Sequence, residues 1–340
     1  MVCFVKFKEI KVLLKYFIVF FSLIFAAYLV YSRWTPGQEI RDGRHDLGRN
    51  GIWIQHGWLG NDFWFSHNKK EYKKSYFRNS DQLQRLAVLF REHHITDIFP
   101  HLCPTYPTGR IPLVDPKQTE LFLDIFQDFR VMPWVGGVLG TQVFLENPFW
   151  RNKFVVSVKK LFVAHPRLSG IHINIEPCPS GNREFLSLLE EIRNALPKEK
   201  ILSVAGYPPP TLLHPFHDVH WDKTYFGSVA QRADQIAVMM YDTALRQQKM
   251  YQYLMASWTN EILDWTSPAQ ILLGVPTYKD QGVGYHDHKV ENLENSLLGI
   301  HAGLQSYKSL PVNYQGIALY CEWEMEEVEW KLLREHFLKL

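Results

Sequence analysis

The stretch LSGIHINIEP, residues 168–177, decides how the rest of the sequence is interpreted. Apolar and polar residues alternate in it with a period of two, which is typical of a β-strand with two different faces. A half-solvated antiparallel strand alternates in the same way. Here, however, the polar face ends in Glu176 directly before a Pro-Cys-Pro break, where a strand must stop. A polar face that leads to a glutamate at the C-terminal end of a strand is typical of a (β/α)₈ barrel.

Similar short apolar or alternating runs recur along the chain, and each is followed by a segment with helical periodicity. The expected strands are 51–57, 95–102, 130–136, 170–176, 201–206, 235–242, 271–277 and 316–322. The expected helices are 81–93, 117–129, 150–165, 182–196, 224–233, 250–265, 293–307 and 325–338. Strict alternation predicts a parallel sheet with crossover helices. Eight such units predict a closed (β/α)₈ TIM barrel over residues 51–340. No GxGxxG follows the first run, which argues against a dinucleotide-binding fold.

The composition gives few further constraints. The net charge is +2 over 340 residues, which provides no argument for nucleic acid as a partner. Aromatic residues make up 14% of the chain. They fit either core packing or sugar binding, because pyranose rings present apolar faces that stack on Trp and Tyr. We predict no cofactor.

The N-terminal segment is expected to interact with a membrane. Residues 16–31 are almost wholly apolar, four lysines precede them, and Arg33 follows. No clear small-x-small cleavage site follows, so we favour an uncleaved single-pass anchor (1–32) with its lysines in the cytoplasm. A cleaved signal peptide is the alternative. Both readings export the barrel, and residues 33–50, rich in Gly and Arg, are expected to form a stalk.

Candidate catalytic residues come from two expected strand ends. Glu176 and Asn174 share the polar face of the strand 170–176, and Tyr241 and Asp242 end the strand 235–242. In a barrel these ends meet at one mouth. A phenol and a carboxylate there can hold a polar substrate group and tune the glutamate. The ordinary alternative for Glu176 is a surface residue that caps the next helix, and for Asn174 a residue that satisfies polar groups inside the barrel. For Tyr241 and Asp242 it is a hydrogen-bond network at the rim with no substrate.

Aromatic side chains are expected around the same mouth. Tyr278 follows the strand 271–277, Tyr320 and Trp323 lie at the end of 316–322, and Trp53 and Trp134 lie on the first and third strands. Together with Met239 and His172 they form the candidate substrate-binding set. For any single tryptophan, packing is the more common role.

These motifs together resemble glycoside hydrolase family 18, the chitinase-like barrels. The family pattern Asp-Gly-x-Asp-x-Asp-x-Glu corresponds to residues 169–176, of which Gly170 and Glu176 match. The family's Met-x-Tyr-Asp motif is matched by Met239, Tyr241 and Asp242, and its Gly-Val-Pro-x-Tyr motif by residues 274–278. The tryptophan that the family has on strand eight corresponds to Tyr320 in this chain. The last Asp of the first pattern is Asn174, and this Asn-x-Glu pair is similar to the family 85 endo-β-N-acetylglucosaminidases.

The resemblance implies a retaining, substrate-assisted hydrolysis of β-linked N-acetylglucosamine glycans such as chitin, peptidoglycan or N-glycan cores. Glu176 would be the general acid and base, and Asn174 and Tyr241 would hold the acetamido group. The alternative is a chitinase-like barrel that binds such glycans without cleaving them.

Histidines and cysteines leave two further options open. A metal-dependent hydrolase would need His214, His217 and His220, or the 286–288 cluster, to converge, and no HExxH-type signature supports this; we predict no metal. A Cys103–Cys178 disulfide across the rim is possible.

Overall fold

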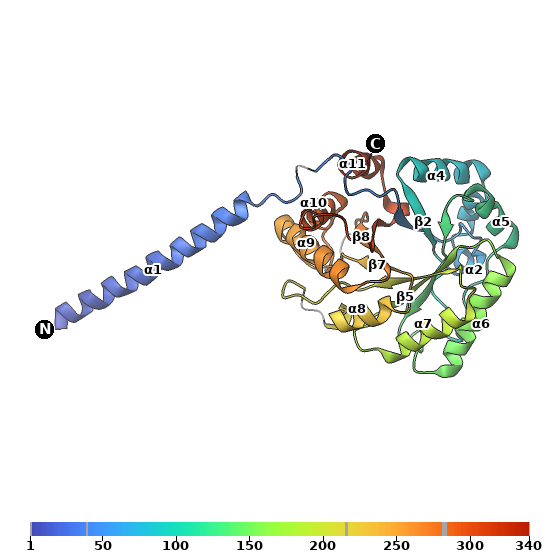
Figure 1. Ribbon diagram of the computed structural model, residues 1–340, viewed down its shortest axis with the longest axis horizontal. Helices are drawn as coiled ribbons and strands as arrows, with labels where there is room; N and C mark the ends of the chain where they lie inside the picture. Colours follow the sequence, from blue (N-terminus) through green and yellow to red (C-terminus); the bar gives the residue numbers. More distant parts are fainter. Residues whose placement is uncertain (1, 39, 215–216, 281–283, 340) are drawn as a thin grey trace.

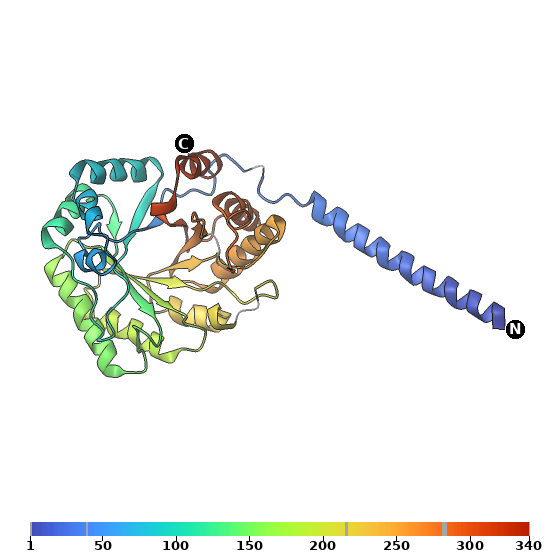
Figure 2. The same ribbon diagram turned by 180° about the vertical axis from the view of Figure 1, so that it is seen from behind.

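The computed structural model describes residues 2–38, 40–214, 217–280 and 284–339. It has two parts, a long N-terminal helix α1 (Val2–Arg33) and a ring of strands surrounded by helices (Figure 1). Seen from behind, α1 again extends away from the ring (Figure 2). The predicted (β/α)₈ barrel is therefore confirmed.

The strands form one parallel sheet in the order β3-β2-β1-β9-β8-β7-β6-β5-β4. Their bounds are β1 Asn50–Ile54, β2 Ile95–Pro100, β3 Arg130–Val131, β4 Trp134–Val138, β5 Gly170–Glu176, β6 Ile201–Gly206, β7 Gln235–Met239, β8 Gln270–Pro276 and β9 Tyr314–Tyr320. The single expected strand 130–136 is split in two at Met132-Pro133. Its first part pairs with β2 and its second with β5, so this interrupted strand closes the ring. Proline has no N–H for the ladder, which explains the interruption.

The helices between the strands begin where the sequence offers caps. Asn or Asp side chains accept a backbone N–H at the starts of six of them, as expected for N-cap residues. These helices are α4 Ser80–Glu92, α5 Pro116–Ile125, α6 Pro148–Ala164, α7 Arg183–Ala195, α8 Lys223–Ala230 and α10 Leu293–Leu304. The others on the ring are α9 Gln248–Trp265 and α11 Glu327–His336. An unexpected excursion, α2 Asp62–His67, η1 Glu71–Lys73 and α3 Lys74–Phe77, follows β1. Two further short turns are η2 His217–Val219 and η3 Glu322–Glu324.

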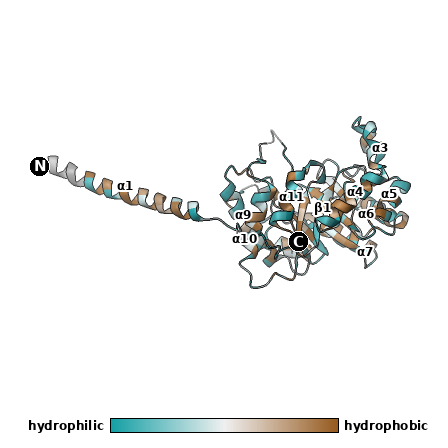
Figure 3. Cartoon of the chain, turned by 90° about the horizontal axis from the view of Figure 1, so that it is seen from above, coloured by the Kyte–Doolittle hydropathy of each residue, from teal (hydrophilic) through white to brown (hydrophobic). Residues whose placement is uncertain are grey.

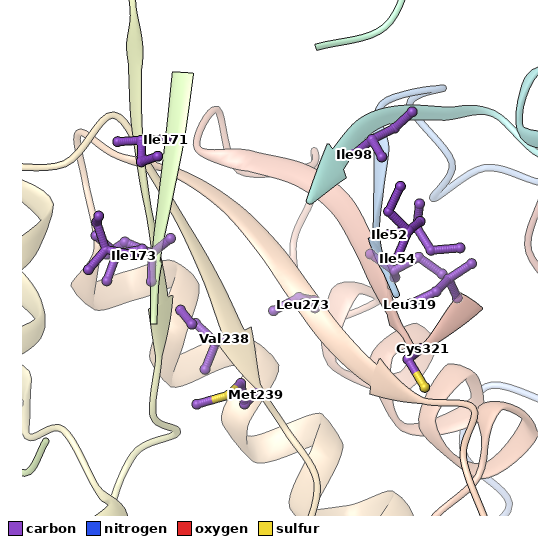
Figure 4. Close-up of a cluster of buried hydrophobic side chains, with 14 of the residues drawn as sticks. Ile52, Ile54, Ile98, Ile171, Ile173, Val238, Met239, Leu273, Leu319 and Cys321 are labelled. Atoms are coloured by element: carbon purple, nitrogen blue, oxygen red, sulfur yellow. The ribbon is translucent and has the colours of Figure 1, made fainter. Parts of the chain in front are cut away.

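The alternation in β5 separates two kinds of packing. Ile171, Ile173 and Ile175 belong to the large apolar layer between the sheet and the helices, part of which is seen in Figure 4. A second, smaller apolar cluster contains Trp53, Phe99 and Trp134. The expected division of β5 into a core face and a barrel-lining face is confirmed.

The N-terminal half of the barrel is filled by a continuous hydrogen-bond network. Arg130 donates to Asp97 from two nitrogens at 2.6 and 2.7 Å. Gln235 and Gln315 also donate to Asp97, at 2.6 and 2.8 Å. Ser203 donates to Gln235, and the network continues to His172. Every member of this chain of contacts has a partner.

His172 is held in one tautomer by this network. Ser203 donates its proton to Gln235 Oε1 at 2.7 Å, so it accepts from His172 Nδ1 at 2.8 Å. The other ring nitrogen then accepts from Trp53 Nε1 at 3.1 Å. Burial lowers the pKa of His172 to about 3, which agrees with a neutral ring.

Several described residues of the expected stalk (33–38 and 40–50) are packed on the barrel. Ile40, His45 and Asp46 are buried, and His45 Nδ1 lies 2.8 Å from His301 Nδ1 in α10. Asp46 contacts His94 and accepts from the backbone N–H of Lys339 at 3.1 Å. The prediction of a spacer was wrong for residues 40–49, because polar composition does not reveal that these side chains find partners on the barrel surface.

The helix α1 is the one described element that is long and apolar enough to cross a membrane. The candidate span is Ile10–Arg33, with a mean hydropathy of 2.2 and no part buried. Figure 3 shows its hydrophobic colouring. A signal sequence has the same properties.

Candidate active site at the mouth of the barrel

Glu176 ends β5 at the mouth and is held by two hydrogen bonds. Asn174 Nδ2 donates to its Oε1 at 2.7 Å, and the Tyr207 hydroxyl donates to its Oε2 at 3.2 Å. Burial raises the pKa of Glu176, and the negative charge of Asp242 raises it further, while the two hydrogen bonds act in the opposite direction. The net rise favours a protonated carboxyl, which is what a general acid needs.

Asn174 is buried against β4 and has an unused acceptor. Gly136 has a φ of +137°, and a Cβ there would lie 1.7 Å from the Asn174 carbonyl oxygen. Only glycine permits this close approach of the two strands. The side-chain Oδ1 of Asn174 is buried and has no hydrogen-bond partner among the described residues. An unsatisfied buried acceptor of this kind is costly unless a ligand uses it.

Tyr241, Asp242 and Tyr278 form a cluster at the ends of β7 and β8. The Tyr278 hydroxyl donates to Asp242 Oδ1. Tyr241 packs edge-on against Tyr278 at 5.8 Å and stacks on Tyr320 at 5.4 Å. Asp242 adopts a φ of +60°, in the left-handed region that Asp tolerates better than most residues. The structure thus brings these expected residues together, with Asp242 close enough to raise the pKa of Glu176.

His286 and Glu291, from the segment after β8, lie next to Asp242. His286 Nδ1 lies 3.3 Å from Asp242 Oδ1 and 3.9 Å from Glu291 Oε2. The backbone N–H of Thr243 donates to both oxygens of Glu291. Burial lowers the pKa of His286, but the nearby carboxylates of Asp242 and Glu291 outweigh it, and the net pKa is raised. Burial raises the pKa of Glu291 to about 7.

The aromatic residues of the candidate set lie at two depths. Tyr320 lies next to Trp134, with ring centroids 6.1 Å apart, and next to Trp323 at 5.8 Å. Tyr320 and Trp323 are half-buried at the mouth. Trp53 and His172 are buried in the core below it, whereas Met239 is buried to the same extent as Trp134 and Tyr241. The structure therefore does not bring Trp53 or His172 to the open surface.

A row of closely packed rings, called here the stacked row although only its His56–Trp64 pair is parallel, continues from Trp134 and was missed in the sequence analysis. His101 packs on Trp134 at 3.9 Å, His56 on His101 at 3.6 Å, and Trp64 on His56 at 4.2 Å. These residues lie in three different segments, so no single motif reveals them. Tyr207 was missed for the same reason, because only the fold places its loop beside Glu176.

A histidine from each of the two clusters, His214 and His286, contacts Asp242. His214 Nδ1 lies 3.1 Å from His220 Nε2, and His214 Nε2 lies 3.1 Å from the Asp242 carbonyl oxygen. The side chain of His217 falls outside the described residues. The donor atoms of Asp242, His286 and Glu291 lie within 4.8 Å of one another, a spacing that could hold a metal ion. Protein donors already contact both carboxylates.

The cysteines beside the mouth are free thiols. Cys103, Cys178 and Cys321 are buried and unbridged in the described structure, so the Cys103–Cys178 disulfide is not formed. Burial raises the pKa of Cys178 to about 12, which makes its thiol unreactive.

A comparison with protein-family models decides the family. The model for glycosyl hydrolases family 18 matches residues 111–331, more than half of the chain. The chain belongs to glycosyl hydrolase family 18. It is thus a glycoside hydrolase by family, as the motifs at Gly170, Glu176 and 239–242 predicted.

Solved structures support the same fold for this family 18 chain. The Bacillus cereus spore cortex-lytic enzyme SleL is 14% identical, with a TM-score of 0.54 over 85% of this chain and 75% of that one. A chitinase from Chromobacterium violaceum is 15% identical, with a TM-score of 0.51 over 84% and 98%. A chitinase from Bacteroides thetaiotaomicron is 12% identical, with a TM-score of 0.51 over 85% and 97%. No curated protein sequence matches the chain.

Proposed function

We propose that this protein is a retaining hydrolase of β-linked N-acetylglucosamine glycans, with Glu176 as its acid and base. The observation that carries the proposal is the paired geometry of Asn174 and Glu176. One carboxyl at the mouth has a raised pKa, and next to it lies an amide whose oxygen has no partner among the described residues. Chitinases and a cortex-lytic enzyme among the similar structures point to the same class of sugar.

The reaction uses the sugar's own acetamido group in place of a second carboxylate. The acetamido oxygen attacks C1, and Glu176 gives its proton to the leaving glycosidic oxygen, so the C1–O bond breaks as the new one forms. The resulting carboxylate then takes a proton from water, which attacks C1 from the opposite side and reopens the ring. Two displacements retain the β configuration.

Asn174 and Tyr241 are the orienting groups in this proposal. The free Oδ1 of Asn174 can accept the acetamido N–H, which gains positive charge as the cyclic intermediate forms. Hydrogen bonds to charged groups are worth about 1.5–3 kcal/mol. Burial raises the pKa of Tyr241 well above its ordinary value, so its hydroxyl remains a donor for the acetamido oxygen. Asp242, held by Tyr278 and His286, supports the raised pKa of Glu176.

Product analysis tests the reaction. The full-length protein in detergent is incubated with chitooligosaccharides and, separately, with peptidoglycan fragments, and the products are identified by mass spectrometry. NMR of the first-formed reducing ends should show the β anomer. Binding without cleavage of any of these glycans would favour the non-catalytic alternative, although a glycan-binding protein has no need of a buried carboxyl such as Glu176.

We further propose that α1 anchors the barrel on the extracytoplasmic side. The lysines before the apolar stretch and the exposed apolar surface of α1 support this topology. Protease added to intact cells or spheroplasts should then digest the barrel. Complete protection of the barrel in cells with an accessible surface would contradict it, and release of a shortened soluble form would identify a cleaved signal.

A further inference from the structure

The excursion after β1 forms a basic arm, defined here as residues 62–78. It contains five basic and two acidic residues, a net charge of +3, whereas the whole chain has +2. Lys74 and Arg78 face Asp62 at 3.9 and 2.8 Å. In the part of the chain that the structure describes, Lys69, Lys70 and Lys73 form no such ion pair. The segment therefore keeps a net charge of +3, with Glu71 as its one acidic residue outside these ion pairs.

The arm is fixed at the mouth of the barrel. Trp64 in α2 ends the stacked row that runs through His56 and His101 to Trp134, and Trp134 packs on Tyr320. Phe63 packs edge-on against Tyr106 in the loop after β2. The arm thus stands at a fixed place relative to the Glu176 site.

Lys70 couples the arm electrostatically to this row. Its Nζ lies 5.1 Å from the centroid of the Trp64 ring, on a half-buried side chain. Burial lowers the pKa of His56 to about 4, and the nearby charge of Lys70 also lowers it, so His56 stacks as a neutral ring. The row therefore adds no positive charge of its own, and the lysines are the cationic feature at this rim.

Resting on the function proposed above, we propose that the basic arm binds carboxylate groups of an acidic N-acetylglucosamine glycan while a neighbouring linkage lies at Glu176. Exposed lysines on a rim attract an anionic chain over about 10 Å at moderate salt. A neutral polymer such as chitin gives these charges nothing to bind. The arm would therefore select acidic glycans over neutral ones.

The position of the arm favours a glycan over an anionic lipid surface. The helix α1 joins the barrel beside α9, where Lys249 Nζ donates to the carbonyl oxygens of Tyr31 and Ser32. In Figure 1 the label α2 lies on the other side of the ring from α1, and in Figure 3 α3 projects from the far end of the barrel. The arm is thus remote from the place where a bilayer would meet the chain.

The test compares two substrates and two matched triple variants of the full-length protein in detergent. The substrates are chitohexaose and peptide-free N-acetylglucosamine–N-acetylmuramic acid strands, which carry one lactyl carboxylate per disaccharide. The arm variant is Lys69→Gln, Lys70→Gln and Lys73→Gln. The control variant, Lys159→Gln, Lys160→Gln and Lys198→Gln, removes the same charge from exposed positions. Lys159 and Lys160 lie toward the end of α6, and Lys198 lies in the turn before β6, on the side of the barrel away from the mouth.

The expected result is a change in substrate preference. The ratio of kcat/KM on acidic strands to that on chitohexaose should fall about tenfold in the arm variant, because three exposed charge pairs, each weak by itself, are lost. The control variant should keep the wild-type ratio. Raising the salt concentration should lower the wild-type ratio and have less effect on the arm variant.

An unchanged ratio in the arm variant would overturn the inference while leaving the proposed function intact. So would an arm variant that loses binding to phosphatidylglycerol vesicles but keeps the substrate ratio, because the arm would then be a lipid site. If the wild type cleaves neither substrate, the proposed function fails instead. The same comparison is then made by titration calorimetry of binding, and equal affinity of both triple variants for the acidic strands would overturn the inference there too.

Discussion

Both halves of the barrel interior contain polar side chains, but only in the N-terminal half does each of them have a hydrogen-bond partner. In the N-terminal half, Asp97, Gln235, Gln315, Ser203 and His172 form an unbroken network. In the mouth, Asn174 Oδ1, Thr105 Oγ1 and Trp134 Nε1 are buried without a hydrogen-bond partner among the described residues. A satisfied buried network makes the fold specific, whereas orphaned polar atoms cost stability unless something binds them. The contrast fits our proposal that the N-terminal half holds the barrel together and that the mouth binds the glycan.

Replacing Glu176 should produce the largest effect on the mouth and almost none on the lower half. Glu176→Gln keeps the size and the hydrogen-bonding capacity of the side chain but cannot donate and accept a proton. We expect kcat to fall by about 10²–10⁴-fold or more, because one residue serves both steps. Steady-state kinetics on one chitooligosaccharide measure this, and calorimetric binding should stay near the wild-type value. Wild-type turnover would remove the assignment of Glu176.

Replacing Asp97 should have the opposite pattern, with a large effect on the N-terminal half of the barrel and little effect on the mouth. Asp97→Ala leaves Arg130, Gln235 and Gln315 without their common acceptor, and breaking a buried charged pair costs about 3–5 kcal/mol. Because Arg130 is partly exposed, we expect a loss of about 3 kcal/mol in the free energy of unfolding, measured by urea titration.

A surface pair provides the control for Asp97. Asp124 accepts from Arg167 at 2.6 Å, but both side chains are exposed. Asp124→Ala should therefore change the unfolding free energy by less than about 1 kcal/mol. Equal losses of unfolding free energy in the two variants would show that the network around Asp97 stabilises the fold no more than a surface ion pair does.

Asn174 should have an intermediate effect, confined to the chemical step. Asn174→Ala removes the unpaired acceptor, and we expect kcat to fall by about 10–100-fold with a smaller change in affinity. Asn174→Asp should stay active with a displaced pH–rate profile, since a second carboxylate beside Glu176 raises at least one pKa. If Asn174→Ala is as fast as the wild type, Asn174 belongs with the structural residues of the lower half.

The smallest effects should appear as opposite shifts of the basic limb of the pH profile of kcat/KM. This limb falls as the general acid Glu176 loses its proton. The Tyr207 hydroxyl stabilises the carboxylate, so Tyr207→Phe should raise the pKa of Glu176 and move the limb to higher pH. The Asp242 charge has the opposite influence, so Asp242→Asn should move the limb to lower pH. Shifts in the same direction would contradict this account of Glu176.

The sequence predicted what depends on local pattern. Apolar and alternating runs located the strands. The split at Pro133 was not indicated, because a proline within an apolar run is equally compatible with a strand edge. From the motifs we expected five residues at one mouth of the barrel, and the structure has them there: Asn174, Glu176, Tyr241, Asp242 and Tyr278. Depth was not predictable, since alternation tells which face a residue is on and not how far down the barrel it lies. Trp53 and His172 were therefore expected too near the surface.

Contacts that join distant loops could not be read from the chain at all. Tyr207 reaches Glu176 from the loop after β6, and His286 reaches Asp242 from the loop after β8. Residues 40–49 looked like a spacer because they are polar. Their partners, His301, His94 and the end of the chain, lie far away in the sequence.

Gly37 and several residues between 40 and 49 pack on the barrel, so few residues are free between α1 and the enzyme. A side chain at Gly37 would already collide with Leu298 and His301 in α10, and Trp34 contacts Tyr253 in α9. If α1 is held in a bilayer, the barrel cannot swing outward on a tether and moves only laterally with its anchor. The catalyst would then search in two dimensions, and the amount of glycan processed would scale with its density per unit of membrane area. A glycan layer lying beyond the height of the barrel itself would be out of reach.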